Sequence, residues 1–274
     1  MTELSEICDR YRIPPDTRPR LKHRDPGDKE LAEGDKSQGV AWRERLSEEL
    51  DELQDLLYAQ KKHRILLILQ GMDTSGKDST IRRVFRAVDP LGVRVANFRP
   101  PSEEELAHDY LWRVHRQVPG NGEIVIFNRS HYEDVLVARA RGHQKDGDQR
   151  RRLAQIADFE RMLSEEGSTI VKCYLHISHE EQRRRLQQRL DDPTKHWKFD
   201  YSDIREREYW DQYMAAYEDA ITATSLPHAP WYVIPANHKW VRDLAVSAIL
   251  VQTLRDLEMQ YPPPPKGLDQ VTLS

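Results

Sequence analysis

A glycine-rich turn between a strand and a helix restricts the fold of this chain more than any other feature. The apolar run ILLIL (65–69) leads into GMDTSGK (71–77), and a helical pattern over 80–88 follows. Glycine lets the backbone wrap closely around an anion, which the backbone N–H groups and the helix N-terminus then face. The spacing G-x-x-x-x-G-K in this context predicts a phosphate-binding loop, or P-loop. The alternative, a glycine turn with an incidental lysine, would not require the strand and the helix on either side.

Apolar runs and helical patterns alternate along the rest of the chain. Strands are expected at 65–69, 93–98, 123–127, 169–177 and 231–234, and helices at 40–58, 80–88, 102–117, 131–141, 148–166, 178–190, 203–224 and 239–259. Ser102 with Glu105, and Ser178 with Glu181, have the spacing of a helix-capping box. The alternation predicts an α/β fold of the P-loop kinase type, a three-layer sandwich with a mostly parallel five-stranded sheet and a helical lid. Ligands of such sheets bind at the carboxyl ends of the strands.

Composition divides the 274 residues into a central domain and two flanking segments. Residues 1–38 are polar, contain four prolines and lack a steady period, so we expect an extended N-terminal arm. Residues 39–260 carry the predicted strands and helices and are expected to form a P-loop phosphotransferase domain, with its lid at about 183–225. The proline-rich segment 261–274 is expected to be a loose tail.

Charge and cysteine content narrow the classes of partner and compartment. The net charge of −4 argues against a protein coated in positive charge, so we expect no nucleic-acid partner. No run approaches the roughly 20 apolar residues of a membrane span, and the N-terminus lacks the apolar core of a signal peptide, so we expect no membrane partner. Cys173 lies in a strand-like run, so a disulfide with Cys8 is not expected, and we predict a cytoplasmic protein.

The side chains of the loop predict both phosphate binding and a metal ion. Lys77 would place a positive charge on the terminal phosphates. The carboxylate of Asp73 would repel phosphate unless a cation lies between them, which indicates Mg²⁺, with Mn²⁺ as the alternative. Asp78 stands where a hydroxyl residue normally ligates magnesium, and we interpret it as a first-turn residue stabilised by the helix dipole. Ser79 offers a hydroxyl nearby, but out of register.

A second motif, FNRSHYED (127–134), follows the third predicted strand. A metal-positioning Asp usually ends such a strand, but Asn128 stands there and brings no charge. Arg129 is expected to lie near the transferred phosphate. Glu133 and Asp134 come about one helical turn later and are candidates for the missing carboxylate. The alternative is that both are only first-turn helix acids.

A third basic segment follows the fourth predicted strand. It contains Arg183, Arg184, Arg185 and Arg189 on a predicted helix, and then DPTKHWK (192–198). Small-molecule phosphoryl-transfer enzymes keep a lid at this place, and its closure would bring arginines onto phosphate charge and exclude water. The alternative, an exposed amphipathic helix, fits two of the four arginines. The triplet at 150–152 is interpreted as a solvated helix face.

Together these segments resemble the polyphosphate kinase 2 family. The similarity is carried by GMDTSGKDSTIRRVF (71–85), FNRSHYEDVL (127–136) and RLDDPTKHWKF (189–199), with DYLWRVH (109–115) and APWYVIPAN (229–237) in addition. It spans about residues 15–262, nearly the whole chain. Asn128 in front of Arg-Ser-His-Tyr-Glu-Asp is similar to the class III branch, whereas relatives in other branches carry Asp-Arg-Ser-Trp there.

The resemblance implies a polyphosphate-dependent nucleotide kinase with a P-loop core and a helical lid, and the class III branch is associated with phosphorylating both AMP and ADP. It implies functional roles for Asp73, Lys77, Arg129, Asp134 and Arg189. The predicted metal ligands are Asp73, Glu133 and Asp134. The predicted phosphate-binding set is Gly71, Ser75, Gly76, Lys77, Asp78, Ser79, Arg82, Arg83, Asn128, Arg129, Lys195 and Lys198.

The expected function is reversible phosphoryl transfer between inorganic polyphosphate and AMP or ADP, with GMP and GDP as further candidate substrates and ATP as a product. A nucleotide phosphate is already a competent nucleophile, so positioning and electrostatics are expected to supply most of the acceleration. Transfer between two phosphoanhydrides is nearly balanced in energy, which predicts reversibility. We also expect a homo-oligomer, a dimer or a tetramer.

Two alternative functions belong to other classes. An ATP-dependent kinase of a small metabolite is disfavoured by the carboxylate in the loop and by the additional arginines. A non-enzymatic nucleotide switch would usually carry an Asn-Lys-x-Asp base-reading motif, and the nearest segment here, ANHK (236–239), does not match it.

Overall fold

A central β-sheet forms the middle layer of the protein in the computed structural model, which describes residues 3–98, 100–142 and 146–273. Over these residues the sheet has six strands: β1 (Arg12–Ile13), β2 (Arg64–Gln70), β3 (Val93–Asn97), β4 (Ile124–Asn128), β5 (Ser168–His176) and β6 (Trp231–Pro235). Their order is β1-β6-β5-β2-β4-β3, and every neighbouring pair is parallel except β1 with β6. The predicted mostly parallel sheet is confirmed. The predicted count of five strands is wrong, because β1 was missed.

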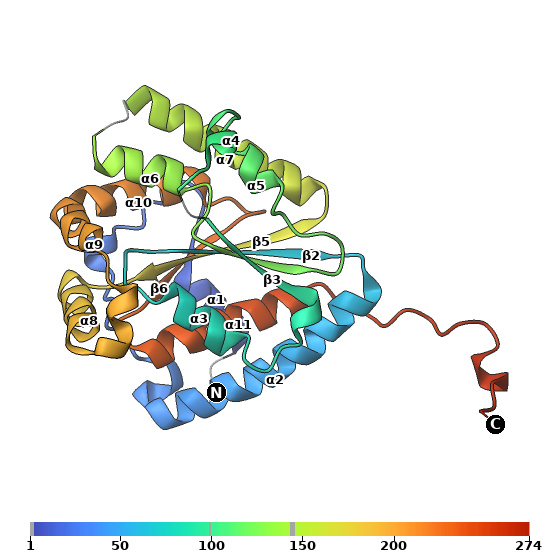
Figure 1. Cartoon of the computed structure of the whole chain (residues 1–274). Coiled ribbons are helices and arrows are strands. Elements are labelled where there is room, and N and C mark those ends of the chain that lie inside the picture. The colour runs from blue at the N-terminus through green and yellow to red at the C-terminus, as the bar shows by residue number, and fades with distance from the viewer. Residues whose placement is uncertain (1–2, 99, 143–145, 274) are drawn as a thin grey trace.

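Helices cover both faces of this sheet (Figure 1). One face carries α1 (Leu4–Tyr11), α2 (Lys36–Gln60), α3 (Lys77–Val84) and α11 (Lys239–Arg255). The other carries α4 (Glu103–Leu106), α5 (Trp112–His115), α6 (Glu133–Ala140), α7 (Asp146–Glu165) and α10 (Trp210–Thr224). At the left edge of the view, α8 (His179–Asp191) and α9 (Tyr201–Glu206) lie beside the carboxyl ends of the strands. The predicted three-layer sandwich is confirmed.

The core is deepest around β2 and α11. All of Ile65 to Leu69 is inaccessible to solvent, as expected for a central parallel strand covered on both faces. Helix α11 is buried around its whole circumference, because it packs on the sheet and also against α1, α2 and α3. In the described ranges, no helix is both long and apolar enough to cross a bilayer.

Residues 4–13 are part of this core, whereas the sequence predicted an extended N-terminal arm. Leu4, Ile7, Cys8 and Tyr11 are all buried on one side of α1, at the spacing of an amphipathic helix, and α1 packs on α11. Ile13 is buried in β1, which pairs with the edge of β6. The polar character of the first 38 residues as a whole concealed this short apolar stripe.

Two predicted helices are each divided in the structure. The segment 102–117 opens with the predicted capping box at Ser102 and Glu105, but α4 ends at Leu106. The carboxylate of Asp109 then accepts hydrogen bonds from the backbone N–H groups of Leu111 and Trp112, which starts a new turn and α5. The segment 203–224 is likewise divided, because a 3₁₀ turn at Arg207–Tyr209 separates α9 from α10.

Candidate active site: the phosphate-binding loop and the side chains that face it

The loop predicted from the sequence lies between β2 and α3, at the carboxyl end of the central strand. Two of its glycines are required by geometry. Gly71 has φ +151°, and a Cβ there would lie 2.8 Å from the carbonyl oxygen of Leu175. Gly76 has φ +109°, and a Cβ there would lie 1.8 Å from a guanidinium nitrogen of Arg242. Any larger residue at either position would force the loop to move.

Lys77 is held inside the loop. Its ammonium donates to the carbonyl oxygen of Gly71 at 2.6 Å and approaches that of Met72 at 3.4 Å. Burial, together with the nearby charge of Arg129, lowers the pKa of Lys77 to about 8. Neutral carbonyl groups do not cancel the charge of a buried cation, so this ammonium attracts an anion. This is the position from which a P-loop lysine contacts terminal phosphates.

Arg129 joins the second motif to the loop. Its guanidinium lies 2.9 Å from Asp73 Oδ1 and 3.4 Å from Glu133 Oε2. The charge of Glu133 raises the pKa of Arg129, and Asp73 adds to this effect. Burial alone would lower that pKa, but the two carboxylates outweigh it, so the guanidinium stays charged. Its backbone has φ +65°, a conformation that non-glycine residues rarely adopt and that is often found at functional sites. The side chain is still 44% exposed and therefore accessible to a ligand.

The next three residues of the second motif are buried and stabilise the turn instead of facing the loop. The side chains of Ser130, His131 and Tyr132 face the core. Buried Glu160 on α7 accepts a hydrogen bond from Tyr132 Oη at 2.9 Å, lies 3.2 Å from His131 Nε2 and pairs with buried Lys172 on β5. This network fixes the turn that presents Arg129 and Glu133.

The two candidate acids of the second motif point to different surroundings. Glu133 pairs with Arg129. In the orientation of the Gln70 amide that completes its hydrogen bonds, the amide nitrogen donates to Glu133 Oε1 at 3.1 Å. Asp134 faces Arg152 at 4.0 Å, and burial raises its pKa. The basic side chains that act on its pKa, Arg152 first, differ from the groups around Arg129. The structure thus brings Glu133 to Asp73, and places Asp134 apart from that pair.

Asn128 ends β4 and links three segments at the sheet edge. Its amide nitrogen donates to Asp78 Oδ1 at 2.8 Å and to Asn97 Oδ1 at 2.9 Å. Asp78 is the acid in the first turn of α3, as interpreted from the sequence, and its carboxylate is engaged by Asn128. Ser79 donates its hydroxyl to the carbonyl oxygen of Gly76.

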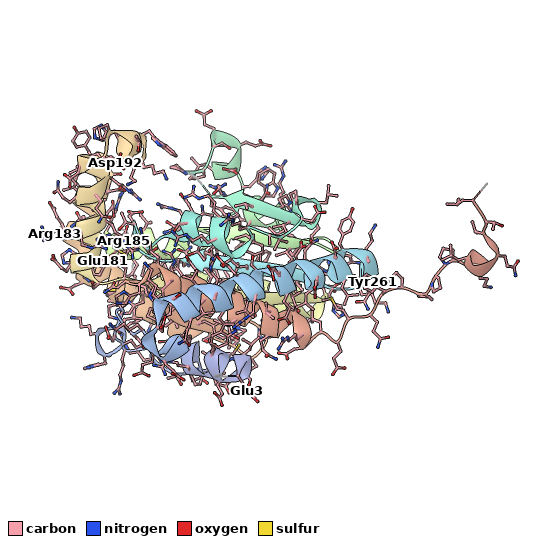
Figure 2. The ribbon with its side chains drawn as sticks, turned by 90° about the horizontal axis from the view of Figure 1, so that it is seen from below. Glu3, Glu181, Arg183, Arg185, Asp192 and Tyr261 are labelled. Atoms are coloured by element: carbon pink, nitrogen blue, oxygen red, sulfur yellow. The ribbon has the colours of Figure 1, made fainter. Side chains whose placement is uncertain are left out.

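The arginines of α8 fall into two groups. Arg183 and Arg184 are exposed and pair with Glu180 and Glu181 on their own helix, so the amphipathic-helix alternative describes these two. Figure 2 shows Arg183 on the outer side of α8, whereas Arg185 points toward the body of the protein. Arg185 is buried. Arg189 donates to the carbonyl oxygen of Lys198 and pairs with Asp203 at 3.1 Å.

Asp203, at the start of α9, is a further candidate site residue that the sequence did not reveal. Burial, followed by the charge of Asp73, raises its pKa to about 6. Its carboxylate pairs with Arg189, and the charges of Asp73 and Arg129 are near enough to shift its pKa. One acid in WKFDYSD (197–203) has no distinguishing sequence signal, because its importance depends on how the lid folds back.

The remaining predicted phosphate contacts lie at the margins. Lys195 pairs with Asp192 at 2.6 Å, and Lys198 lies over the ring of the exposed Trp197. Arg82 is exposed, and Arg83 pairs with buried Asp243. Lys239, at the start of α11, was not predicted. Burial lowers its pKa, and so do Arg185, Arg242, Arg83 and Arg184, which shows that positive charge gathers beside the loop.

The donor set suits a magnesium ion that substrate phosphates help to hold. In the part of the chain that the structure describes, no group of three or more acidic, histidine or cysteine side chains could form a metal site by itself. Mg²⁺ usually takes one or two protein carboxylates and completes its shell with water and phosphate oxygens. Asp73 and Glu133, both in contact with Arg129, match that pattern.

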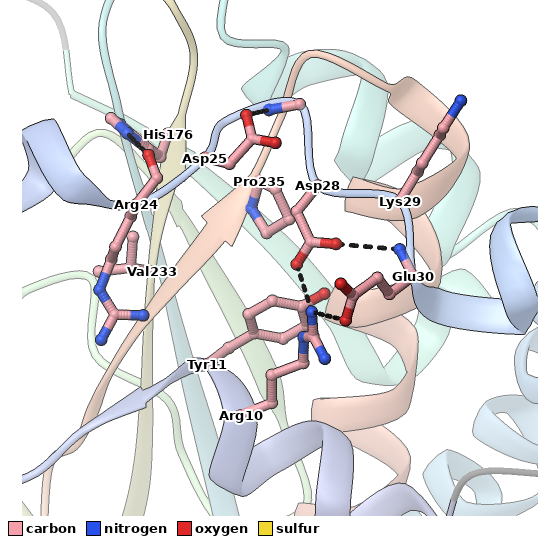
Figure 3. Close-up of a pocket in the computed structure, with 11 residues that line it drawn as sticks. Arg10, Tyr11, Arg24, Asp25, Asp28, Lys29, Glu30, His176, Val233 and Pro235 are labelled. Atoms are coloured by element: carbon pink, nitrogen blue, oxygen red, sulfur yellow. Dashed lines mark hydrogen bonds and ion pairs between the residues drawn. The ribbon is translucent and has the colours of Figure 1, made fainter.

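A separate hollow of about 560 Å³ lies away from the loop (Figure 3). It is formed by α1, the segment 24–30 and the carboxyl ends of β5 and β6, and its lining includes Tyr11, Arg24 and His176. Arg10 crosses it to pair with Asp28 and Glu30. Arg10, Asp28 and Glu30 are thus paired with one another, and none of the lining residues belongs to the loop, so we do not take this hollow as the candidate active site.

The contacts of Arg129 decide the class of this site. A purely structural glycine turn would not require a buried lysine in the loop, or an accessible arginine in a rare backbone conformation that pairs with two carboxylates. In combination with the parallel sheet, they define a P-loop phosphotransferase.

The chain belongs to the polyphosphate kinase 2 family, which it matches over residues 33–262. It is 53% identical to the AMP/ADP-polyphosphate phosphotransferase of Meiothermus ruber, over 96% of this chain and 99% of that protein. It is 42% identical to the ADP-polyphosphate phosphotransferase of Rhodopseudomonas palustris, over 78% of each chain. The crystal structure of polyphosphate kinase 2 from Arthrobacter aurescens TC1 superposes with a TM-score of 0.91 at 42% identity, over 96% of this chain and 93% of that one.

Proposed function

We propose that this protein transfers phosphoryl groups reversibly between inorganic polyphosphate and a nucleotide, with AMP and ADP as acceptors. The observation that carries the proposal is the contact of Arg129 with Glu133 and with Asp73, a residue of the loop that holds Lys77. Its family supports the use of polyphosphate. AMP and ADP are favoured because the relative from Meiothermus ruber is named for both nucleotides. GMP and GDP are further candidate acceptors.

The residues act by positioning and by neutralising charge. Lys77 and the backbone N–H groups of the loop bind the terminal phosphates of one substrate. Arg129 faces the transferred group from the side of β4, and Arg189 approaches from the lid. Because an acceptor phosphate is already nucleophilic, the site needs no strong general base. Asp203 holds Arg189 in place until a phosphate competes for it.

Mg²⁺, with Mn²⁺ as an alternative, would be held by Asp73 and Glu133 together with substrate oxygens. When bound, the ion neutralises charge that develops on the phosphoryl group. Asp134 stands apart from this pair. We propose that it holds Arg152 against the start of α6. Arg152 also donates a hydrogen bond to the backbone carbonyl oxygen of Asp134.

Polyphosphate is proposed to lie along the positive surface formed by Arg82, Arg83 and Lys239. Lys239 is exposed and lies near other cations, and this surface borders the loop through α3 and α11. Lys195 and Lys198 stand on the lid and are proposed to meet the phosphate chain or the nucleotide only when the lid closes.

Incubation of AMP or ADP with polyphosphate and Mg²⁺, without ATP, tests this function. New ADP and ATP are expected, and the reverse reaction should lengthen or regenerate polyphosphate. If phosphate transfer requires ATP and an unrelated metabolite, the protein is instead an ATP-dependent kinase. If nucleotide binds without turnover in either assay, it is a switch.

The compartment and the assembly remain proposals as well. Cys8 and Cys173 are both free and buried, in keeping with a reduced cytoplasmic protein. We also propose a homo-oligomer, a dimer or tetramer, which light scattering of the purified protein would test.

A further inference from the structure

Two buried arginines donate hydrogen bonds to the backbone of the phosphate-binding loop. Arg185 comes from α8 and Arg242 from α11, and both are almost completely buried. Burial lowers the pKa of each, which shows that water solvates their charges poorly. Charged groups in such places require strong hydrogen-bond partners.

The partner that both arginines share is the carbonyl oxygen of Ser75. It accepts from Arg185 Nη1 at 3.1 Å and from Arg242 Nη1 at 3.0 Å. Arg185 Nη1 also donates to the carbonyl oxygen of Thr74 at 2.9 Å, and Arg242 Nη2 donates to Ser79 Oγ at 2.8 Å. Two consecutive carbonyl groups of the loop are therefore directed toward buried positive charge.

The direction of one carbonyl group determines the direction of the following N–H group. A peptide unit is planar and trans, so the N–H of Gly76 points opposite to the carbonyl of Ser75. Among the hydrogen bonds recorded for the described residues, this N–H has no protein partner. Gly76 is the N-cap residue directly before α3, where backbone N–H groups of a P-loop face the anion.

Arg185 also secures the loop to its surroundings. Its Nη2 donates to the carbonyl oxygens of Ala236 at 2.6 Å and Asn237 at 2.9 Å, in the connection between β6 and α11. One guanidinium thus bridges four carbonyl groups in two loops. The short ammonium of lysine could not reproduce this fork.

We propose that Arg185 and Arg242 are positioning residues that hold the Ser75–Gly76 peptide with its N–H toward the bound phosphate. The proposal rests on the loop being the phosphate seat. Loss of either fork frees the peptide to rotate, which removes a preorganised donor and weakens phosphate binding.

Kinetics of lysine variants test the two forks. Arg185→Lys and Arg242→Lys are expected to raise the KM for polyphosphate at least about tenfold, as for the loss of a charge-assisted hydrogen bond. A purely structural role would instead reduce the fraction of folded enzyme, lowering apparent kcat at unchanged KM. Matched controls are Arg183→Lys on α8 and Arg255→Lys on α11, which are exposed and pair with Glu180 and Glu49. Both controls should keep the wild-type KM.

The outcomes separate this inference from the loop assignment. If Lys77→Ala binds polyphosphate as the wild type does, the loop is not the phosphate seat. If Lys77→Ala loses binding while both fork variants keep the wild-type KM, the positioning role is wrong.

A spectroscopic test can be decided on the wild-type protein alone. Ser75–Gly76 is the one Ser-Gly dipeptide in the sequence. Cell-free synthesis with carbonyl-¹³C serine and ¹⁵N glycine therefore gives a single correlated amide signal, that of Gly76. Addition of tripolyphosphate to the wild type should move this signal downfield, and less so in Arg242→Lys. A signal that stays in place in the saturated wild type would overturn the proposal.

Discussion

At the scale of single residues, the buried ammonium of Lys77 controls phosphate binding through its protonation. Its pKa of about 8 in the free protein means that it loses its proton as pH rises above that value. A bound phosphate stabilises the charged form and raises the pKa again. We therefore expect affinity for tripolyphosphate to fall above pH 8, by up to about tenfold per pH unit, with uptake of a proton on binding at pH 9.

Titration calorimetry in buffers of different ionisation enthalpy measures this proton uptake. Lys77→Arg is the control, because its guanidinium stays charged, so the ligand's own titration is shared by both proteins. Equal uptake in the two proteins would contradict the assignment to Lys77.

The same lowered pKa of Lys77 affects stability. The free energy of unfolding should rise as pH increases from about 8 toward 10.5, because in this range the unfolded chain binds a proton that the folded protein has lost.

Arg129 makes a second prediction at this scale. Arg129→Ala should lower kcat/KM by about 10²–10³-fold, as for loss of one donor to developing charge, with little change in melting temperature because the side chain is half exposed. Steady-state rates with polyphosphate and AMP measure the effect. Arg161→Ala, which removes an exposed arginine paired with Asp158 and Glu165, is the control. A wild-type rate in Arg129→Ala would remove this residue from the mechanism.

The sequence predicted those site residues that stand in contiguous motifs. Lys77 and Asp73 belong to one loop with fixed spacing, and Arg129 directly follows a strand. Asp203, Lys239 and Arg242 were missed, since each approaches the loop only after the lid and α11 have packed. Their sequence neighbours give no signal of that proximity, which is a property of the tertiary fold.

At the scale of elements, the lid has a part attached to the loop, at the start of α8, and a more exposed part that follows α8. Gln182 donates to the carbonyl oxygen of Asp73, and Arg185 binds four further carbonyl groups, so the first two turns are attached to the loop. Beyond Asp191, Trp197 and Tyr201 are nearly 80% exposed. The moving part of the lid is therefore expected within about 187–206, a narrower range than the 183–225 predicted from the sequence.

Hydrogen exchange would locate that boundary. Peptides from 179–186 should exchange slowly, and those from 192–206 fast, because few buried contacts hold the latter. Polyphosphate with AMP should slow exchange in 192–206 and leave 179–186 almost unchanged. Uniform exchange along 179–206 would mean that this whole segment moves as one body.

Element boundaries were predictable where a local signal sets them. The capping box at Ser102 starts α4 as predicted, and the caps at Ser178 and Asp35 act through the same chemistry. The breaks after Leu106 and before Trp210 were not predicted, because apolar spacing continues across both. The carboxylate of Asp109 binds backbone N–H groups that a continuous helix would use, so the helix is interrupted there although the apolar spacing continues.

At the scale of the whole molecule, the two ends of the chain have opposite roles. The N-terminal segment adds a helix and a strand to the domain, through Ile7 and Ile13 in the core. The C-terminal segment leaves the body after α11, and Figure 1 shows it extending away from the sandwich. Both segments are polar and proline-rich on average, so composition alone could not separate them. What distinguishes the first is a buried stripe that needs α11 as its partner.

This contrast predicts how the two ends contribute to stability. Ile7→Ala removes a completely buried side chain between α1 and α11, and should lower the free energy of unfolding by about 2–5 kcal/mol. Deletion of residues 261–274, whose described side chains are exposed, should change it by less than about 0.5 kcal/mol. Urea denaturation followed by circular dichroism compares both with the wild type. Ile7→Ala of wild-type stability would mean that the N-terminal helix is not part of the cooperative core, and a destabilised deletion would mean that the tail docks on the domain.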